Sequence, residues 1–346
     1  MERTDNLNIV CFKPLITPEE LKKEFPETDE VAHVVATARK NIQHVLTNRD
    51  KRRLVITGPC SLHDRKATLE YAAKLRKLQD QVSDKVVVVM RTYFEKPRTT
   101  LGWKGMLYDP YLDNSYDIEE GFRRARGLLV AIGEIGLPTA TEFLDPIVPQ
   151  YIADLVSWAA IGARTSESQI HRQMASGLSM PVGFKNSMEG NMITAMDAIK
   201  AALSSHSFMG IDGNGKVIIA ETRGNKYGHL VMRGGSSGPN YSSENIASAK
   251  VLLQKANIRT KIVIDCSHAN SHYDYRQQRE AFLDVTEQIR QGGRLIAGLM
   301  LESFLYDDNQ PFDKPQNLKY GVSVTDKCIS WEETEELIRY LVLRKN

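Results

Sequence analysis

The stretch Arg53–Asp64, RLVITGPCSLHD, carries the pattern that decides the fold: a short β-rich run followed by a turn with a reactive side chain, Cys60. The run Arg53–Thr57 is the first of eight, and amphipathic helical stretches separate them. This alternation is typical of parallel strands joined by helical crossovers. It predicts an α/β fold, a (β/α)8 TIM barrel. The eight runs are Arg53–Thr57, Val86–Arg91, Thr139–Glu142, Ala160–Arg164, Val182–Lys185, His229–Arg233, Lys261–Asp265 and Leu295–Leu301.

A side chain able to bind an anion or a metal stands at or just after the end of almost every run. The strands of such a barrel all point the same way, so their carboxyl ends converge on one face, where these folds hold their active sites. The sequence therefore predicts one polar pocket. Its residues in chain order are Cys60, Arg91, Glu142, Arg164, Lys185, Arg233, His268 and Glu302.

The residues before the first run predict an N-terminal helical extension, 1–50. Thr17-Pro18-Glu19-Glu20 combines an N-cap threonine, a proline at the first helical position and a glutamate at the third, which is typical of a helix start. From Asp29 to about Val45 the apolar residues recur at helical spacing, which predicts a second helix outside the barrel repeat.

One segment interrupts the alternation inside the barrel, which is expected to span 51–346. His206–Ile211 and Lys216–Glu221 flank Asp212-Gly213-Asn214-Gly215, a strong hairpin turn. We therefore expect an inserted β-hairpin at 206–221. No long linker or low-complexity tract indicates a second independent domain.

Composition restricts the classes of function. Lys and Arg total 45 against 43 Asp and Glu, so a net charge of +2 gives no global field that would favour nucleic acid or an anionic membrane. The longest apolar runs, such as Leu295–Leu301, fall far short of the roughly 20 residues that span a bilayer. Met1–Asn8 lacks the apolar region of a secretory signal, so a cytoplasmic location is expected. The four cysteines, for which thiols are expected rather than disulfides, are Cys11, Cys60, Cys266 and Cys328.

Four candidate residues are of the types that borderline divalent metals prefer. Cys60, His268 and Glu302 directly follow strand-like runs, whereas Asp326 joins them only if the segment after the last strand folds back over the barrel mouth. Taken singly, a cysteine is usually an apolar filler, a histidine a hydrogen-bonded structural group and a carboxylate a surface or capping group. Their convergence on one face predicts a metal site.

The predicted pocket also gathers cations. Each one alone is as often a solvated strand end, but several on one face repel one another unless an anion neutralises them. Arginine offers a planar fork and lysine a point charge to phosphate and carboxylate groups. Such anions are therefore expected as substrates. The cations are Arg91, Lys96, Arg98, Arg164, Lys185 and Arg233.

Two loops add to this expectation. Lys96-Pro97-Arg98-Thr99-Thr100 places two cations and two hydroxyls beside a rigid proline, which suits a sugar phosphate, although it also fits an ordinary basic loop. Gly234-Gly235-Ser236-Ser237-Gly238 could present backbone N–H groups to an anion, although glycine-rich turns are common.

At this level of detail the chain resembles a known family, the type I 3-deoxy-D-arabino-heptulosonate 7-phosphate (DAHP) synthases, from about Leu15 to the C-terminal helix. The motifs that carry the resemblance are GPCSLHD at 58–64, RTYFEKPRTTLGWKG at 91–105, TEFLDP at 141–146, GARTSESQIHR at 162–172, PVGFKN at 181–186, RGG at 233–235, DCSHANS at 265–271 and ES at 302–303. The resemblance implies an aldol-type condensation of phosphoenolpyruvate with D-erythrose 4-phosphate and water, giving DAHP and phosphate. This reaction is the first step of the shikimate pathway.

The resemblance also implies site residues. One divalent ion per subunit, Mn, Fe, Co or Zn, is expected on Cys60, His268, Glu302 and Asp326. Catalytic roles are implied for Cys60, Lys96, Glu142 and His268. Phosphoenolpyruvate is expected at Arg91, Lys96, Glu142 (through water), Ala163, Arg164, Lys185 and Arg233. Erythrose 4-phosphate is expected at Lys96, Pro97, Arg98 and Thr99.

Two stretches depart from the family pattern. Ser187-Met188-Glu189-Gly190 stands where relatives usually have Gly-Thr-Asp-Gly. Ser-Ser-Gly follows Arg233-Gly234-Gly235 where relatives have a lysine and one residue fewer, so no anion contact is carried over from that lysine. Neither departure removes a catalytic group.

The resemblance further implies that the extension and the hairpin form subunit contacts, in a homodimer or homotetramer, and a pocket for a feedback aromatic amino acid. L-tyrosine is the hypothesis for this effector, because Gly210 stands where phenylalanine-sensing relatives carry serine and leaves room for a phenolic hydroxyl. L-phenylalanine is the alternative. The matching residues are Asp5, Pro146, Gln150, Leu178, Ser179, Phe208, Gly210 and Ala220.

Two other functions compete with this interpretation. A related phosphoenolpyruvate-dependent sugar-acid synthase, such as one accepting arabinose 5-phosphate, shares much of the chemistry, but KPRTT and the extension favour the four-carbon aldehyde. An amino-acid-binding sensor on a catalytically dead barrel would need lost metal ligands. All four are present.

Overall fold

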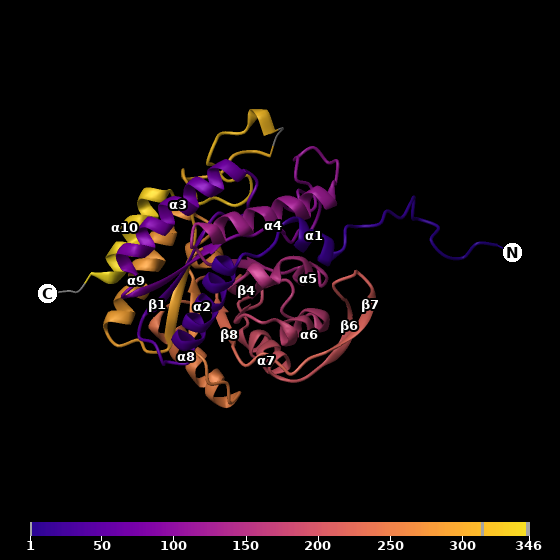
Figure 1. Cartoon of the computed structure of the whole chain (residues 1–346). Coiled ribbons are helices and arrows are strands. Elements are labelled where there is room, and N and C mark those ends of the chain that lie inside the picture. Colours follow the sequence, from indigo (N-terminus) through magenta and orange to yellow (C-terminus); the bar gives the residue numbers. More distant parts are fainter. Residues whose placement is uncertain (1, 313–314, 344–346) are drawn as a thin grey trace.

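Eight parallel strands close into a barrel with the order β1-β10-β9-β8-β5-β4-β3-β2, and helices surround it (Figure 1). The structure, a computed structural model, describes residues 2–312 and 315–343. The predicted (β/α)8 fold is confirmed. The barrel strands are β1 Arg53–Gly58, β2 Val86–Arg91, β3 Thr139–Glu142, β4 Trp158–Ile161, β5 Val182–Lys185, β8 Gly228–Met232, β9 Ile262–Asp265 and β10 Ile296–Glu302.

Among the described residues, six of the eight outer helices begin at a side-chain N-cap. In the first of them, the Asp64 carboxylate accepts a hydrogen bond from Ala67 N, and Tyr71, Leu75 and Leu78 are buried on one face at helical spacing. The helices are α3 Arg65–Val82, α4 Ile118–Glu134, α5 Val148–Ile152, α6 Gln169–Gly177, α7 Met192–Leu203, α8 Ser243–Lys255, α9 Gln278–Arg290 and α10 Trp331–Val342. The exceptions, without a side-chain cap in the described chain, are α5 and α9. Four short 3-10 helices are Ala153–Leu155, His268–Ser271, Tyr275–Gln277 and Pro315–Asn317.

Two helices precede the barrel, α1 Pro18–Glu24 and α2 Asp29–Leu46, as the sequence predicts. The hydroxyl of Thr17 accepts from Glu20 N, and Thr17 N donates to the Glu20 carboxylate, which completes the predicted capping box. The last turn of α2 packs into the barrel interior, where Ile42, Val45 and Leu46 join the core formed by inward-facing strand residues. The amino ends of the strands are therefore closed by α2.

An antiparallel hairpin leaves the barrel between α7 and β8. Its strands are β6 Ser207–Ile211 and β7 Val217–Glu221, and the Asp212 carboxylate caps the predicted turn by accepting hydrogen bonds from the backbone of Asn214 and Lys216. Figure 1 shows the hairpin on the outside of the barrel beside α6. Its outer face is apolar and exposed: Met209 is 82% and Ile219 75% accessible.

Four barrel strands, β1, β8, β9 and β10, begin or end one residue away from the predicted runs, and β4 differs by more. The run Ala160–Arg164 was expected to be a strand, but β4 is Trp158–Ile161, and Arg164 lies in the turn that follows. The chain bends there because Thr165 N and Ser166 N both donate to the Gly162 carbonyl. Trp158 starts the strand instead, paired in register with Ala140.

A buried histidine crosses the barrel interior and makes the stability pH-dependent. The Trp158 indole donates to Nε2 of His229 at 3.1 Å, and Nδ1 of His229 lies 3.0 Å from the Tyr227 carbonyl, so the ring is neutral with its proton on Nδ1. Burial lowers the pKa of His229 to about 4. Below pH about 6.5, the unfolded-state pKa of histidine, the unfolded chain therefore binds a proton at this side chain and the folded chain does not. The free energy of unfolding falls as a result.

Replacing His229 with glutamine is expected to flatten the acid limb of the stability profile. For the native protein, protonation of His229 in the unfolded chain lowers the free energy of unfolding by about 3 kcal/mol as the pH falls from 7 to 4. Glutamine can still accept from Trp158 but does not titrate, so this decrease should disappear. Denaturant midpoints at pH 7, 5.5 and 4.5 measure it, with His33→Gln on the surface of α2 as the control. Equal slopes for the native and His229→Gln proteins would refute the assignment.

Neither disulfides nor membrane-spanning helices are found in the part of the chain that the structure describes. All four cysteines are free, with Cys11 exposed and the other three buried. No helix within 2–312 and 315–343 is both long and apolar enough to traverse a bilayer.

Candidate active site and metal centre

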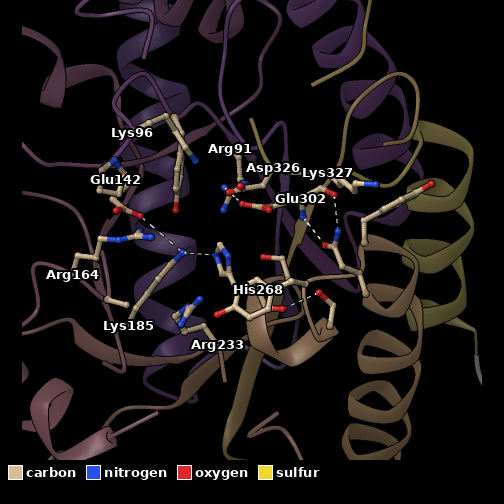
Figure 2. Close-up of a pocket in the computed structure, with 18 of the residues that line it drawn as sticks. Arg91, Lys96, Glu142, Arg164, Lys185, Arg233, His268, Glu302, Asp326 and Lys327 are labelled. Atoms are coloured by element: carbon tan, nitrogen blue, oxygen red, sulfur yellow. Dashed lines mark hydrogen bonds and ion pairs between the residues drawn. The ribbon is translucent and has the colours of Figure 1, made fainter. Parts of the chain in front are cut away.

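A cavity of about 310 Å³ opens at the carboxyl ends of the barrel strands, where the sequence placed its polar pocket (Figure 2). Two expected residues are outside its lining: Cys60 is fully buried at its edge, and Thr99 is exposed on the loop above. The expected residues that line it are Arg91, Lys96, Pro97, Arg98, Glu142, Ala163, Arg164, Lys185, Arg233, His268, Glu302 and Asp326.

Three of the four expected metal ligands form a cluster. The ligand atoms of Cys60, Glu302 and Asp326 all lie within 4.8 Å of one another, and the Cys60 thiol lies 3.2 Å from the Asp326 carboxylate. Asp326 reaches this position because the segment after β10 folds back over the end of β1, fixed by a 2.7 Å hydrogen bond between the Ser61 and Thr325 hydroxyls. A thiol and two carboxylates form a donor set that fits a borderline divalent ion.

Two cations balance the negative charge of this cluster. The Lys96 ammonium donates to the Cys60 sulfur at 3.0 Å, and Arg91, fully buried, pairs with the Glu302 carboxylate at 3.1 Å. Burial, with the Glu302 carboxylate second, raises the pKa of Cys60 to about 12. Burial opposes protonation of Lys96, but Cys60, Asp326 and Glu302 outweigh it and raise its pKa. A buried thiol of this kind ionises when a bound cation replaces its proton.

His268 is turned away from this cluster. Its Nε2 atom lies 3.3 Å from the Asp265 carboxylate and 3.3 Å from the Lys185 ammonium, and it is not among the atoms that lie within 4.8 Å of one another. The backbone of His268 has φ +58, in the left-handed region, which directs the ring across the cavity. Figure 2 shows it between the cationic side and the carboxylate side of the pocket.

Gln278 clamps the end of β10. Its side-chain amide donates to the Glu302 carbonyl at 3.1 Å, and its amide oxygen accepts from Glu302 N at 2.9 Å. Gln278 is buried in α9 and also lines the cavity. This pair of bonds fixes the backbone that carries one carboxylate of the cluster, so Gln278 is a positioning residue.

Replacing Gln278 with leucine is expected to weaken divalent metal binding about 10- to 100-fold, the usual effect of losing a group that orients a ligand. Equilibrium dialysis against Mn²⁺ or Zn²⁺, which needs no turnover, measures the affinity directly. Gln278→Glu, which keeps the acceptor, should lose less. Native affinity in the leucine variant would contradict the role.

The opposite side of the cavity is cationic, with Arg164, Lys185 and Arg233 facing one another in Figure 2. Lys185 pairs with the Asp265 carboxylate at 3.1 Å and lies 3.9 Å from that of Glu142. Burial opposes protonation of Lys185, but Asp265 outweighs it and raises the pKa of the ammonium; burial likewise opposes ionisation of Asp265, and Lys185 and His268 lower its pKa well below the usual range.

Close packing positions the residues beside this charged pair. A Cβ at Gly162 would collide with the Glu142 carboxylate, so any residue other than glycine would displace that carboxylate. Arg233 is held by its backbone, whose N–H donates to the Asn186 amide at 2.9 Å. Its guanidinium makes no closer described contact than 3.5 Å, to the Gly234 carbonyl, which leaves it available to an anion.

The glycine-rich loop after Arg233 does not form the anion cradle that its composition allowed. Gly234 N donates to the Asn240 amide oxygen at 2.8 Å. Gly235 N and Gly238 N donate to each other's carbonyls, and Ser236 N donates to Met188 O. These N–H groups hold the loop in place, so Arg233 is the candidate anion-binding group of this segment.

The two basic side chains of the loop at 96–99 point in different directions. Lys96 points inward to the Cys60 carbonyl and sulfur, at 3.1 and 3.0 Å. Arg98 is exposed and donates through Nε to the Trp103 carbonyl at 2.7 Å, which fixes its stem at the rim of the cavity.

Sequence reasoning missed several residues of the site. Asp265 is the last residue of β9, so the rule that strand ends converge would have found it, had the following histidine not been chosen instead. Tyr93, two residues after Arg91, and Lys327, directly after Asp326, also line the cavity. The Tyr93 ring lies 3.9 Å below the Arg91 guanidinium, and its buried hydroxyl has no hydrogen-bond partner within the described chain.

Three residues expected in the effector pocket share one face of the hairpin. Phe208 is opposite Ala220 in the β6–β7 register, and Gly210 is the next residue on the same face. All three are half-buried, and a Cβ at Gly210 would meet only side-chain atoms of Phe208, Ile218 and Ala220, at 3.8 to 3.9 Å. A Cβ at Gly210 would therefore fit in ordinary contact with its neighbours.

The other expected effector residues come from separate elements. Pro146 precedes α5 and Gln150 lies in it, whereas Leu178 and Ser179 directly follow α6, which contacts β6. Asp5 is apart from all of them, in an N-terminal segment that leaves the body of the molecule (Figure 1). Its neighbours there are Arg3 and Asn6.

Comparison with known proteins agrees with this geometry. The family model for the DAHP synthetase I family matches residues 28–339. The Tyr-sensitive phospho-2-dehydro-3-deoxyheptonate aldolase of Escherichia coli (strain K12) is 49% identical over 336 residues, which cover 97% of this chain and 94% of that protein. The Trp-sensitive aldolase of the same organism is 50% identical over 341 residues, 99% of this chain and 98% of that one.

A solved structure, phospho-2-dehydro-3-deoxyheptonate aldolase from Francisella tularensis SCHU S4, is similar throughout. The match has a TM-score of 0.95 at 47% sequence identity and covers 96% of this chain and 97% of that one.

Proposed function

The chain belongs to the DAHP synthetase I family, and we propose that the cavity at the barrel mouth carries out the family's reaction with the residues named above. The enzyme is a 3-deoxy-7-phosphoheptulonate synthase that condenses phosphoenolpyruvate with D-erythrose 4-phosphate and water, the first step of the shikimate pathway. The resemblance drawn from the motifs is thereby confirmed. The observation that carries the site assignment is that a metal-ligand cluster and a cationic bed share one cavity.

The family implies a divalent metal, and the residues present fit one. We assign Cys60, Glu302, Asp326 and His268 as its ligands, the last after its ring leaves Asp265, with one ion per subunit. Mn, Fe, Co and Zn all suit this donor set. When bound, such an ion supplies a Lewis acid beside the aldehyde of erythrose 4-phosphate.

The protein groups position and neutralise phosphoenolpyruvate. Arg164, Lys185 and Arg233 offer charge-assisted hydrogen bonds to its phosphate and carboxylate, and Arg91 lies at the junction with the ligand cluster. Ala163 lines the same wall. Because the site holds C3 of the enol against the aldehyde carbon, the two substrates react as if in one molecule. This proximity accounts for much of the rate enhancement. Pro97, Arg98 and Thr99 at the rim are assigned to the sugar phosphate.

Two groups are proposed to move protons. As C3 attacks the aldehyde carbon, the Lys96 ammonium, kept protonated by its anionic neighbours, donates to the aldehyde oxygen, which becomes the new hydroxyl. Water then adds to C2 and gives its proton to Glu142. The C2–O bond to the phosphate then breaks while the C2 hydroxyl becomes the ketone oxygen and gives its proton to the departing phosphate, which leaves toward the cationic bed; Glu142 returns its own proton through solvent to Lys96.

Phosphate release tests this function directly. We expect release only with phosphoenolpyruvate and erythrose 4-phosphate together, loss of activity after chelation, and recovery on adding a divalent ion. Arabinose 5-phosphate in place of the four-carbon aldehyde tests the related sugar-acid synthase. Faster release with arabinose 5-phosphate, or full activity after exhaustive chelation, would overturn the proposal.

We further propose regulation by an aromatic amino acid, L-tyrosine, on the inner face of the hairpin. The curated relatives include Tyr-sensitive and Trp-sensitive enzymes, which supports feedback inhibition of this class. The half-buried face of Phe208, Gly210 and Ala220, where no side chain occupies position 210, supports a ring-sized ligand. Pro146, Gln150, Leu178, Ser179 and Asp5 complete the proposed pocket.

Gly210→Ser is expected to weaken inhibition by tyrosine at least about tenfold, because the added hydroxymethyl group fills the space assigned to the phenol. Inhibition curves with tyrosine, phenylalanine and tryptophan, on native and variant enzyme, measure it. Ala73→Ser, exposed on α3 and away from the hairpin, is the control. Inhibition of the native enzyme by phenylalanine or tryptophan alone would end the tyrosine assignment.

Assembly and location are proposed on the same basis. We propose that residues 1–50 and the hairpin 206–221 make subunit contacts in a homodimer or homotetramer, with 51–346 as the catalytic barrel; Met1 and 344–346 lie outside the described residues. The exposed apolar stripe of the hairpin supports this contact. Light scattering on the purified enzyme tests it. The cytoplasmic location stays a prediction.

A further inference from the structure

A second cavity, of about 720 Å³, lies at the opposite end of the barrel from the active site. Its walls are the last turn of α2, one face of α8, the segment 259–261 before β9, and the loop between α9 and β10. Figure 1 shows α2 and α8 on this side of the molecule. Cavities of roughly 300 to 1,000 Å³ are the usual size for small-ligand sites.

The lining of this cavity combines apolar walls with positive charge. Leu46, Ile246 and Leu295 contribute apolar surface. No described residue in the lining carries a carboxylate, whereas four carry a positive charge, and these are Lys250, Arg259, Lys261 and Arg294. An unbalanced set of cations on apolar walls favours an anion with an apolar body.

Lys261 is the decisive member of the set. It is only 7% exposed, yet within residues 2–312 and 315–343 its ammonium has neither a hydrogen-bond nor an ion-pair partner. The Asp50 carboxylate, which acts on Lys261 only at a distance, is bound to Arg52 at 2.7 Å. Burial and the nearby Arg53 lower the pKa of Lys261. The stem of Lys261 is buried while its ammonium lines the cavity without a protein partner among the described residues, so an anion entering the cavity would meet an unpaired positive charge.

A second polar group in the same wall is unsatisfied. The hydroxyl of Thr260, adjacent to Lys261 in the chain, is buried and has no hydrogen-bond partner among the described residues. Buried side-chain oxygens are nearly always hydrogen-bonded, so the Thr260 hydroxyl and the Lys261 ammonium in one wall offer a donor pair to an anion that enters the cavity.

We propose that this cavity binds a small organic anion, an aryl or alicyclic carboxylate, with its carboxylate on Lys261 and Thr260 and its ring against Ile246 and Leu295. Lys250, Arg259 and Arg294 are exposed and attract the anion to the rim. The site is separate from the barrel mouth and does not depend on the reaction proposed there.

Methyl NMR on the full-length enzyme tests the proposal, because Ile246 and Ile296 both line the cavity and carry δ1-methyl groups. Benzoate is the probe, benzamide is its uncharged counterpart, and inorganic phosphate is an anion without a ring. We expect benzoate to shift both methyl signals saturably and benzamide to bind at least about tenfold more weakly.

Charge variants locate the carboxylate. Lys261→Met, similar in length but neutral, should raise the dissociation constant for benzoate at least about tenfold, whereas Lys261→Arg should keep it within about threefold. Lys77→Met, exposed on α3, makes the same charge change away from the cavity and should have no effect.

Four outcomes would overturn the proposal: no saturable shift with benzoate, unchanged affinity in Lys261→Met, equal binding of benzamide, or binding of phosphate alone. If Lys261→Met does not fold, the comparison of benzoate with benzamide on the native enzyme decides.

Discussion

Replacement of Cys60 by alanine is expected to abolish both divalent metal binding and turnover. The thiol is the one soft donor of the cluster, and without it the ion keeps at most three protein ligands. Lys96 would also lose its 3.0 Å sulfur partner and face the ligand cluster without the anion that holds it in place. We expect a loss of more than about 1,000-fold in kcat/KM, since both the metal and the proposed proton donor are disturbed.

Metal content and activity should fall together in this variant. Equilibrium dialysis followed by elemental analysis measures the first, and phosphate release the second. Cys11→Ala, an exposed cysteine replaced in the same way, should keep both. Retained turnover in Cys60→Ala would show that the ion is held elsewhere, and so would unchanged metal content.

Lys185→Met is expected to lower kcat/KM by about 1,000-fold and to destabilise the fold by about 3 to 5 kcal/mol. The ammonium is the ion-pair partner of Asp265, 3.1 Å away, and methionine would leave that carboxylate buried and uncompensated. It would also remove a cation from the phosphoenolpyruvate bed. Denaturant unfolding and steady-state kinetics separate the two effects.

The double variant Lys185→Met, Asp265→Asn distinguishes structure from catalysis. With the carboxylate neutralised the uncompensated charge is gone, so stability should recover by several kcal/mol relative to Lys185→Met alone. Activity should not recover, because the substrate cation is still missing. If activity returned with stability, Lys185 would be structural only.

The sequence predicted the barrel because the physics of the strands is local. Short β-rich runs such as Val86–Arg91 are buried on both faces and read as continuous apolar segments, and the capping box at Thr17 uses neighbouring residues only. The site followed from topology: parallel strands bring their ends to one face, so Lys185 and Glu302 could be placed together without knowing any distance.

What the sequence could not give depends on contacts between distant segments. The strand β4 starts at Trp158 because the indole has a partner, His229, 71 residues away. The His268 ring points toward Asp265 and Lys185, and its backbone is in the left-handed region. Neither feature can be predicted from the residue type. The second cavity could not be predicted either, because the sequence does not show which cation is left without a partner once the chain has folded.

The last turn of α2 has a consequence for synthesis. Ile42, Val45 and Leu46 are made early, but the core they join includes Val263 and Met300, which leave the ribosome near the end of translation. The apolar face of α2 can pack first against β1, β2 and α4, which follow it in the chain, but its last turn is covered on all sides only when β9 and β10 are made. The nascent chain therefore carries a partly exposed apolar helix end until β10 closes the ring, and chaperones can protect it during that interval.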